Sequence, residues 1–228
     1  MIFDLFHTLV NGAGQDWERA VAEVAMIVGV EPVALLAAYH DTFRQRQVEW
    51  DSEQAVRILA ERAGGSPSRA QVAQAAEVRR ALARRVLGAV QSSTLDVLDA
   101  LRGAGYRLGL VSNATSDTAE SWPGTDLAAR FEVAVFSCEV GVAKPEPRIY
   151  LAATTALSAQ PADCYYVGDG ADSELAGAAV LGMTAIRTTQ HNDSDPSWPG
   201  ITINSLADLL VGLFNDPDSP ARFGGSLS

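Results

Sequence analysis

Residues 13–91 carry apolar side chains at the spacing of amphipathic helices. Trp17, Val21 and Val24, for example, are four and three residues apart, which places them on one helical face. Few runs of β-branched residues interrupt this segment, and Gly-Gly-Ser-Pro-Ser at 64–68 is a clear break between helices. The pattern predicts four or five helices and no strand.

Outside this segment, short apolar runs alternate with stretches of helical spacing. The first run, Met1 to Phe3, is brief, either because the strand is short or because the true start lies upstream. The later runs predict strands at 106–112, 131–137, 164–169 and 184–188, and the stretches around them predict helices at 95–101, 116–129, 146–157 and 173–182. Such alternation is typical of an α/β fold with a parallel, doubly wound sheet and right-handed crossovers.

The helical segment interrupts the alternating pattern, and this predicts two domains. We expect a core domain of residues 1–12 and 92–228 and a helical domain of residues 13–91. The charges support the division, because residues 13–91 hold ten acidic and ten basic residues, whereas the remainder holds 18 acidic and seven basic ones. The residues after Phe214 are rich in Pro, Gly and Ser, and we expect them to be frayed.

The composition indicates a globular protein. The chain has 228 residues, of which 47% are apolar and 20% charged, so it can bury a sizeable core. No apolar stretch reaches the roughly 18 to 20 residues of a membrane span, and no signal peptide is expected, since the first residues lead straight to Asp4. Two cysteines, Cys138 and Cys164, are too few for a disulfide framework, so we expect reduced thiols in a cytoplasmic protein.

The charge balance narrows the class of partner. Seventeen basic and 28 acidic residues give a net charge of −11, which argues against nucleic acid or an anionic membrane. We expect a small-molecule substrate and a monomer or homodimer. Among the basic residues, 16 are arginine and one is lysine, Lys144. Either its ammonium is needed for function or it survives a general preference for arginine codons, and composition leaves both explanations open.

Polar residues follow the predicted strands at the rim of the sheet where open α/β folds bind their ligands. They are Asp4 and Thr8 after the first strand, Ser112 and Asn113 after the second, Lys144 after the third, and Asp169, Asp172, Ser173 and Glu174 after the fourth. This set suits attack on an anionic electrophile. One carboxylate acts as the nucleophile, lysine and hydroxyl neutralise the developing charge, and a second carboxylate shares a divalent cation with the first.

In their order and spacing, these four segments resemble the four motifs of the haloacid dehalogenase-like (HAD) hydrolase superfamily. The resemblance covers essentially the whole chain, including the helical segment after the first strand, which is similar to a C1-type cap. It implies an α/β fold with a doubly wound, parallel, Rossmann-like core and an inserted all-helical cap domain.

The resemblance also implies roles for the motif residues. Asp4 is similar to the nucleophile that forms an aspartyl-enzyme ester, and Thr8 is similar to the residue that hydrogen-bonds near it. Ser112 is similar to the hydroxyl that holds the substrate anion, and the amide of Asn113 is expected to help. Lys144 is similar to the lysine that neutralises charge, which favours the functional explanation of its presence.

The same resemblance implies a Mg²⁺ site. Its ligands would be the carboxylates of Asp4 and Asp169 and the backbone carbonyl of Phe6. Two acidic residues that follow, Asp172 and Glu174, compete for the second carboxylate position of the fourth motif. Glu174 lies five residues after Asp169, which is a usual spacing for this second carboxylate. We expect it to orient the water ligands of Mg²⁺ rather than to bind the ion directly.

Some residues depart from the phosphatase pattern. HAD phosphatases have a second aspartate, the general acid and base, where this chain has Phe6. The loss of a general acid typically costs about 10²- to 10⁴-fold in rate on a poor leaving group.

Other residues resemble those of 2-haloacid dehalogenases, in which the residue at the position of Phe6 is usually tyrosine. The segment 43–50 resembles the dehalogenase cap segment, whose substrate-binding arginine would be Arg44, and Tyr150 matches a dehalogenase tyrosine. Dehalogenases need no metal, however, and have a serine-type residue in place of Asp169.

We give more weight to Asp169, because a second carboxylate facing Asp4 repels it unless a cation lies between them. The first interpretation is therefore a Mg²⁺-dependent hydrolase acting on a small phosphate ester or anhydride with a good leaving group. A 2-haloacid dehalogenase is the alternative, and a non-catalytic binding protein on the same frame is a third. His7 is a candidate to replace the missing acid, because histidine titrates near neutral pH.

Overall fold

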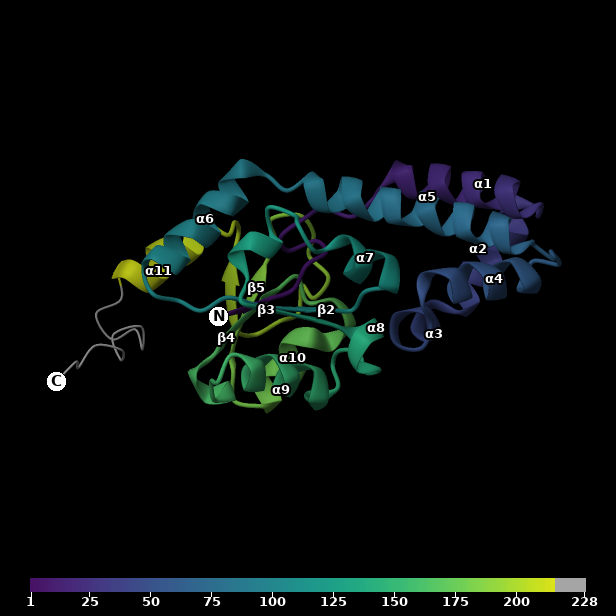
Figure 1. The fold of residues 1–228 in the computed structure, drawn as a ribbon. Helices are drawn as coiled ribbons and strands as arrows, with labels where there is room; N and C mark the ends of the chain where they lie inside the picture. Colours follow the sequence, from purple (N-terminus) through teal and green to yellow (C-terminus); the bar gives the residue numbers. More distant parts are fainter. Residues whose placement is uncertain (216–228) are drawn as a thin grey trace.

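The computed structural model describes residues 1–215 and contains a six-stranded parallel sheet flanked by helices (Figure 1). The strands are β1 (Ile2–Phe3), β2 (Gly109–Ser112), β3 (Val133–Phe136), β4 (Tyr165–Gly168), β5 (Thr184–Thr188) and β6 (Ile201–Ile203). Their order in the sheet is β3-β2-β1-β4-β5-β6, and every neighbouring pair is parallel. The doubly wound α/β core predicted from the sequence is therefore confirmed.

Helices cover both faces of this sheet. In Figure 1, α6 and α11 lie on one side of the strands, whereas α9 and α10 lie on the other. The helices outside the segment 13–91 are α6 (Ser92–Gly103), α7 (Ser116–Ser121), α8 (Ser137–Val140), α9 (Pro147–Ala156), α10 (Glu174–Val180) and α11 (Asp208–Asn215).

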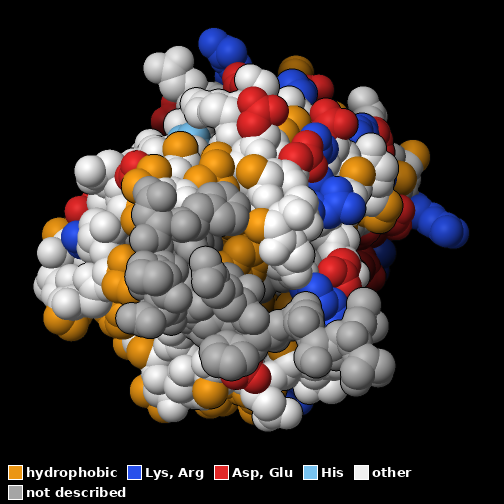
Figure 2. Space-filling model, turned by 90° about the vertical axis from the view of Figure 1, so that its left-hand side faces the viewer, with side chains coloured by type: hydrophobic (Ala, Val, Ile, Leu, Met, Phe, Trp, Pro, Cys, Tyr) orange, Lys and Arg blue, Asp and Glu red, His pale blue; other side chains and the backbone are white. Residues whose placement is uncertain are grey.

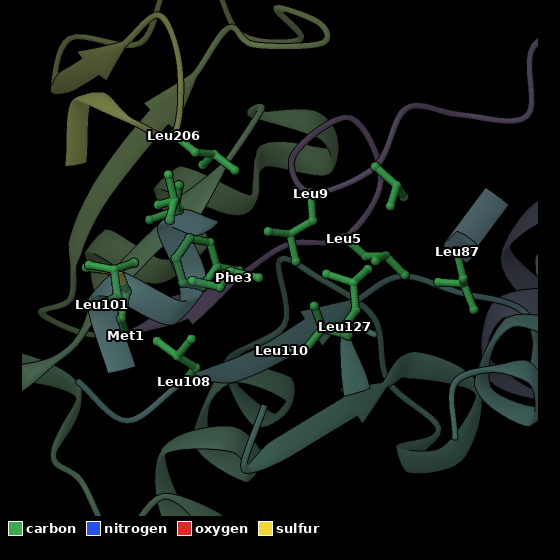
Figure 3. Close-up of a cluster of buried hydrophobic side chains, with 14 of the residues drawn as sticks. Met1, Phe3, Leu5, Leu9, Leu87, Leu101, Leu108, Leu110, Leu127 and Leu206 are labelled. Carbon is green, nitrogen blue, oxygen red and sulfur yellow. The ribbon is translucent and has the colours of Figure 1, made fainter. Parts of the chain in front are cut away.

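Two apolar clusters separate these helices from the sheet. Successive side chains on a strand point to opposite faces, so Phe3 and Leu110 join the cluster that includes Leu101 of α6, whereas Ile2 and Val111 join the cluster on the α9 face. In Figure 3, Phe3 and Leu101 point toward each other within the first of these clusters. Burial on both faces fixes the short β1 in the middle of the sheet, and this places the residue after it at the rim.

Residues 13–91 contain five helices and no strand among the described residues, as their spacing predicts. These helices are α1 (Gln15–Val28), α2 (Pro32–Asp41), α3 (Phe43–Val48), α4 (Ser52–Arg62) and α5 (Arg69–Gly88). They pack around an apolar cluster of their own, which includes Val24, Leu35 and Leu59. A capping box formed by Ser68 and Gln71 starts α5, directly after the break expected at 64–68. We call this helical segment the cap.

The cap contacts the core mainly where α5 packs against α7. Arg79 of α5 and Asp117 of α7 form a buried ion pair with an N–O distance of 2.5 Å. Close by, Glu120 of α7 accepts a hydrogen bond from the hydroxyl of Ser52 at 2.9 Å and forms an ion pair with Arg80 at 3.2 Å. These polar contacts fix the side of the cap that lies against α7.

The structure differs from the sequence prediction in several elements. The helix expected at 116–129 ends at Ser121, and a 3₁₀ turn at Ala128–Arg130 follows, because Pro123 and the positive φ of Gly124 (83°) break the helix. The prediction lacks β6, α8 and α11. β6 is a three-residue edge strand with Ile201 52% exposed, so no buried apolar run marks it. The sequence predicts fraying after Phe214, but Asn215 is the last residue of α11, and residues 216–228 lie outside the described range.

The surface carries charges of both signs. On the face shown in Figure 2, acidic and basic side chains lie next to one another rather than in large areas of one sign. Ion pairs at the surface of the described chain include Arg130 with Asp99 at 2.7 Å and Arg107 with Glu132 at 2.8 Å. Pairs of this kind contribute little to stability, about 0–1 kcal/mol each.

Among the described residues, no single helix has both the length and the apolar composition needed to cross a membrane. The helices α1 and α2 reach that length and composition only when they are taken together, and they are bent by 112° relative to each other.

We predict that Leu98→Ala destabilises the protein by about 2–5 kcal/mol, because the side chain is fully buried between α6 and the sheet and its removal leaves a cavity. Leu151→Ala on α9 is the matched control. Leu151 is 40% exposed, so its loss costs less than about 1 kcal/mol. Urea unfolding of both variants measures the difference, and equal losses would contradict the assignment of Leu98 to the core.

Candidate active site

Three neighbouring strands bring polar residues to the same rim of the sheet. β1 lies between β2 and β4, with Ile2 level with Gly109 on one side and with Tyr166 on the other. The amide of Asp4 donates to the carbonyl of Val167 at 2.9 Å, which continues the ladder to the end of β1. Asp4, Ser112 and Asp169 therefore lie side by side at the carboxyl ends of their strands, and all three are buried.

Both carboxylate oxygens of Asp4 accept hydrogen bonds. Oδ1 accepts from Nζ of Lys144 at 2.5 Å, and Oδ2 accepts from the hydroxyl of Thr8 at 3.1 Å. Burial raises the pKa of Asp4 above its usual value, and the charge of Lys144 only partly offsets this effect. The neighbouring charge of Asp169 raises the pKa further.

Lys144 connects Asp4 to a second carboxylate. Its Nζ lies 2.5 Å from Oε2 of Glu174 and 3.1 Å from the hydroxyl of Tyr166, which itself donates to Glu174 at 2.7 Å. Burial alone would lower the pKa of Lys144, but the charges of Asp4 and Glu174 outweigh it and hold the pKa above its usual value. The ammonium is therefore permanently charged at neutral pH.

Glu174 points into the site from the first residue of α10. Its Oε1 accepts from the amide of Gly170 at 3.1 Å, and a Cβ at Gly168 would collide with this carboxylate, so glycine makes room for it there. Burial and the charge of Asp4 raise the pKa of Glu174 to about 7.

Asp172 lies apart from these carboxylates. It and Ser173 both adopt positive φ, 54° and 57°, and this turn precedes the start of α10 at Glu174. The exposed Asp172 carboxylate instead accepts from the side-chain amide of Asn113 at 2.7 Å. Only Glu174 of the two predicted acidic neighbours thus belongs to the buried group.

Asp169 is held by the loop that follows β5. Its Oδ2 accepts from the hydroxyl of Ser194 at 2.7 Å and lies 3.4 Å from the amide nitrogen of Asn192, while Oδ1 accepts from the amide of Ala171 at 3.2 Å. These contacts fix the orientation of the carboxylate. The sequence analysis did not identify Ser194, because it lies 25 residues after Asp169 in an irregular segment.

Asp4, Asp169 and Glu174 form a group that could hold a metal ion. Each offers a carboxylate oxygen, and these oxygens lie within 4.8 Å of one another. When all three carboxylates are ionised, they and the ammonium of Lys144 carry a formal charge of −2. Carboxylate oxygens are the ligands that Mg²⁺ prefers, so the donor set fits the ion that the motifs imply.

Ser112 and Asn113 have different surroundings. The hydroxyl of Ser112 is buried and has no hydrogen-bond partner among the described residues, although most buried polar groups have one. The side chain of Asn113, in contrast, accepts from the amide of Lys144 at 2.7 Å and donates to its carbonyl at 3.2 Å. Asn113 thus positions the Lys144 loop, while the Ser112 hydroxyl is unpaired among the described residues.

A pocket of about 630 Å³ opens between the cap and this rim of the sheet. On the core side it is lined by Asp4, Lys144 and the side chains of Phe6 and His7, and on the cap side mostly by apolar residues. His7 has a positive φ of 60°, and its Nδ1 has no partner in the described chain. The cap-side lining comprises Ala13, Gly14, Trp17, Leu36, Tyr39, His40, Phe43, Arg46 and Gln47.

The structure does not place two predicted substrate-binding residues in this pocket. Arg44 is exposed, and its Nη1 lies 3.5 Å from the carbonyl of Lys144. Tyr150 is fully buried behind Glu174, where its hydroxyl donates to the Glu174 carbonyl at 2.9 Å. We therefore assign Tyr150 to the support of α10. Arg46, two residues after Arg44, lines the pocket instead, and the sequence analysis did not identify it.

Comparisons with known proteins find phosphatases among the proteins similar to this chain. A phosphoserine phosphatase from Thermus thermophilus is 29% identical over 180 residues, which cover 77% of this chain and 67% of that protein. Matches to several other curated phosphatases cover only 38–42% of their length.

Solved structures share the fold. A 2-haloacid dehalogenase from Pseudomonas syringae superposes with a TM-score of 0.68 at 24% identity, over 93% of this chain and 96% of that one. An enzyme from Bacteroides thetaiotaomicron, described as a HAD family enzyme in complex with magnesium and inorganic phosphate, gives a TM-score of 0.60 at 18% identity, over 85% and 95% of the two chains.

The model of a protein family described as haloacid dehalogenase-like hydrolase matches residues 1–182. That range includes the cap and Asp4, Ser112 and Asp169 at one rim of the parallel sheet, together with Lys144, which reaches Asp4 from the loop between α8 and α9. The chain therefore belongs to the haloacid dehalogenase-like hydrolases and is an enzyme of that family.

Proposed function

We propose that this hydrolase is a Mg²⁺-dependent phosphohydrolase that acts through an aspartyl-enzyme ester on a small phosphate ester or anhydride with a good leaving group. The observation that supports it most is the formal charge of −2 on the buried group of Asp4, Asp169, Glu174 and Lys144. A divalent cation balances that charge, and a dehalogenase that works without metal has no need of Asp169.

Asp4 is the nucleophile of this proposal. One of its oxygens attacks the phosphorus atom, the bond to the leaving group breaks, and an aspartyl phosphate forms; water then attacks the phosphorus and releases phosphate and the free carboxylate. Thr8 and Lys144 each hold one oxygen of the carboxylate and so fix its orientation. Such positioning supplies much of the rate enhancement in phosphoryl transfer.

Positive charge and hydrogen-bond donors stabilise the transferring group. The hydroxyl of Ser112 is buried without a partner in the described chain, so it is free to donate to a phosphoryl oxygen. Asp4, Asp169 and the carbonyl of Phe6 would hold Mg²⁺, with Glu174 beside them; when bound, the ion neutralises charge on the phosphoryl oxygens. Lys144 limits the repulsion among the carboxylates.

Phe6 restricts the leaving group. Its side chain lines the pocket beside Asp4 but cannot donate a proton to a departing oxygen. Substrates whose leaving group is stable as an anion, such as an aryl or acyl phosphate, do not need that proton. Alkyl phosphates such as sugar phosphates do need it.

A 2-haloacid dehalogenase is the second candidate. Phe6 favours it, because halide leaves without a proton, and the likeness in fold to the dehalogenase from Pseudomonas syringae is consistent with it. Asp169 argues against it, since the carboxylate adds negative charge near the nucleophile without a function in metal-free chemistry.

We predict that Asp4→Asn abolishes hydrolysis of an aryl phosphate such as 4-nitrophenyl phosphate, because no other described carboxylate is held by both Thr8 and Lys144. Asp96→Asn, on the exposed face of α6, is the control and keeps the wild-type rate. Release of 4-nitrophenol measures both. Turnover by the Asp4→Asn variant at a substantial fraction of the control rate would rule out the covalent mechanism.

We predict that Mg²⁺ raises the melting temperature and that Asp169→Ala removes the rise. Binding to the native state alone stabilises by about 2.7 kcal/mol at a hundredfold excess over Kd, which corresponds to about 5–10 °C for a protein of this size. Differential scanning fluorimetry with and without Mg²⁺ measures the shift. A wild-type melting curve that saturating Mg²⁺ leaves unchanged would contradict the metal site and favour the dehalogenase.

We predict that Phe6→Asp accelerates hydrolysis of an alkyl phosphate more than that of an aryl phosphate, by up to about 10²-fold, because the new carboxyl group can protonate the departing alkoxide. Phe6→Asn has the same shape without the acidic proton and serves as the control. The ratio of kcat/KM for the two substrates within each variant is the measurement. A wild-type enzyme with equal rates on both would mean that another acid, with His7 the first candidate, already acts there.

A further inference from the structure

Arg46 of α3 is a buried arginine in the wall of the pocket. Only 6% of it is exposed, yet it is one of the residues that line the cavity containing Asp4. One of its terminal nitrogens, Nη2, donates to the carbonyl of Tyr39 at 3.0 Å, while Nε has no hydrogen-bond partner among the described residues. The guanidinium carbon lies 4.7 Å from the centre of the Tyr39 ring and 5.7 Å from that of Phe43.

The positive charge of Arg46 is not balanced by a neighbouring carboxylate. The adjacent buried arginine, Arg79, has its own partner in Asp117, at an N–O distance of 2.5 Å. No acidic side chain in the described part of the chain lies within ion-pair distance of Arg46. Two buried cations therefore share one carboxylate, and burial together with the charge of Arg79 lowers the pKa of Arg46 to about 10.

Such a charge is unfavourable in the free protein, because a buried ion loses its hydration and normally regains the cost from a partner. The aromatic rings of Tyr39 and Phe43 supply part of that compensation through cation–π contacts. A ligand in the pocket can supply the rest. At the other end of the same pocket, Lys144 is already paired with Asp4 and Glu174. Arg46 has no anionic partner of its own among the described residues and can therefore pair with an anionic group of a ligand.

We propose that Arg46 binds a second anionic group of the substrate, a carboxylate, at the cap end of the pocket. The proposal rests on the phosphohydrolase function above and makes it more specific. The substrate is a phosphate monoester or anhydride whose leaving group has an apolar body, which contacts Trp17 and Leu36, and a carboxylate that pairs with the guanidinium. Arg46, and not the exposed Arg44, then determines specificity.

Binding of two inert analogues tests the proposal without requiring turnover. The probes are 3-carboxybenzylphosphonate and 3-carbamoylbenzylphosphonate, which differ only in the charge of the group remote from phosphorus. Titration calorimetry in the presence of Mg²⁺ is expected to show that the wild type binds the carboxylate at least about tenfold more tightly, the gain of one charge-assisted contact. In Arg46→Gln the two affinities are expected to become equal within about twofold, because the contact between the guanidinium and the carboxylate of the probe is lost. The Arg44→Gln control keeps the wild-type preference.

Equal affinities in the wild type, absence of binding by both probes, or a preference that persists in Arg46→Gln would overturn the proposal. Turnover of 3-carboxyphenyl and 3-carbamoylphenyl phosphate is measured in parallel. If neither ester is hydrolysed while the binding preference is present, the phosphohydrolase function fails and the anion site stands. If both are hydrolysed with no preference in binding, the anion site fails and the phosphohydrolase function stands.

Melting temperatures separate ligand binding from a structural role. Arg79→Gln leaves Asp117 buried without its partner and is expected to lower the melting temperature by several degrees. Arg46→Gln removes an unpaired charge, so its melting temperature stays near or above that of the wild type. A fall as large as that of Arg79→Gln would show that Arg46 is needed for folding and would overturn its assignment to substrate binding.

Discussion

The ammonium of Lys144 lies between two buried carboxylates, and the arrangement of the active site depends on that contact. Asp4 and Glu174 are far apart in the sequence, yet each has an oxygen 2.5 Å from Nζ. Like charges buried at short range repel one another strongly, and the ammonium reduces this repulsion by pairing with Asp4 and Glu174. Lys144 thus links the end of β1 to the start of α10. The divalent cation that we propose would balance the negative charge that Lys144 leaves.

The sequence was sufficient for those parts of the fold and site that depend on strand ends. Asp4, Ser112 and Asp169 each follow an apolar run, and the carboxyl ends of parallel strands lie at one edge of a sheet whatever the details of packing. Lys144 stands out as the single lysine in a chain rich in arginine, but composition alone leaves its role open, and the resemblance of its segment to the third motif favours a functional role. The helices of the cap could be predicted for a similar reason, since their apolar spacing repeats over many turns.

Features that depend on how a helix or turn is oriented about its own axis could not be predicted in this way. Arg44 and Arg46 are two residues apart on α3 and so point roughly 200° apart; the packing of α3 against α8, and not the local motif, decides which of them reaches the pocket. Asp172 and Glu174 are separated by the same spacing. There a turn with positive φ at Asp172 and Ser173 directs only Glu174 inward. The edge strand β6 escaped prediction because its side chains are largely exposed.

The ion pair between Arg79 and Asp117 has a consequence for how ligands enter and leave. The pocket lies between cap and core, and the chain passes between them only near residues 10–14 and 89–91. Lifting the cap away from α7 would separate two desolvated charges, which is costly even though water would then reach them. A rotation of the cap about the α5–α7 contact keeps the pair intact and still widens the opposite side of the pocket. In any such motion the pair would act as a pivot, because a hinge with one fixed edge keeps it intact whereas a cap that detaches breaks it.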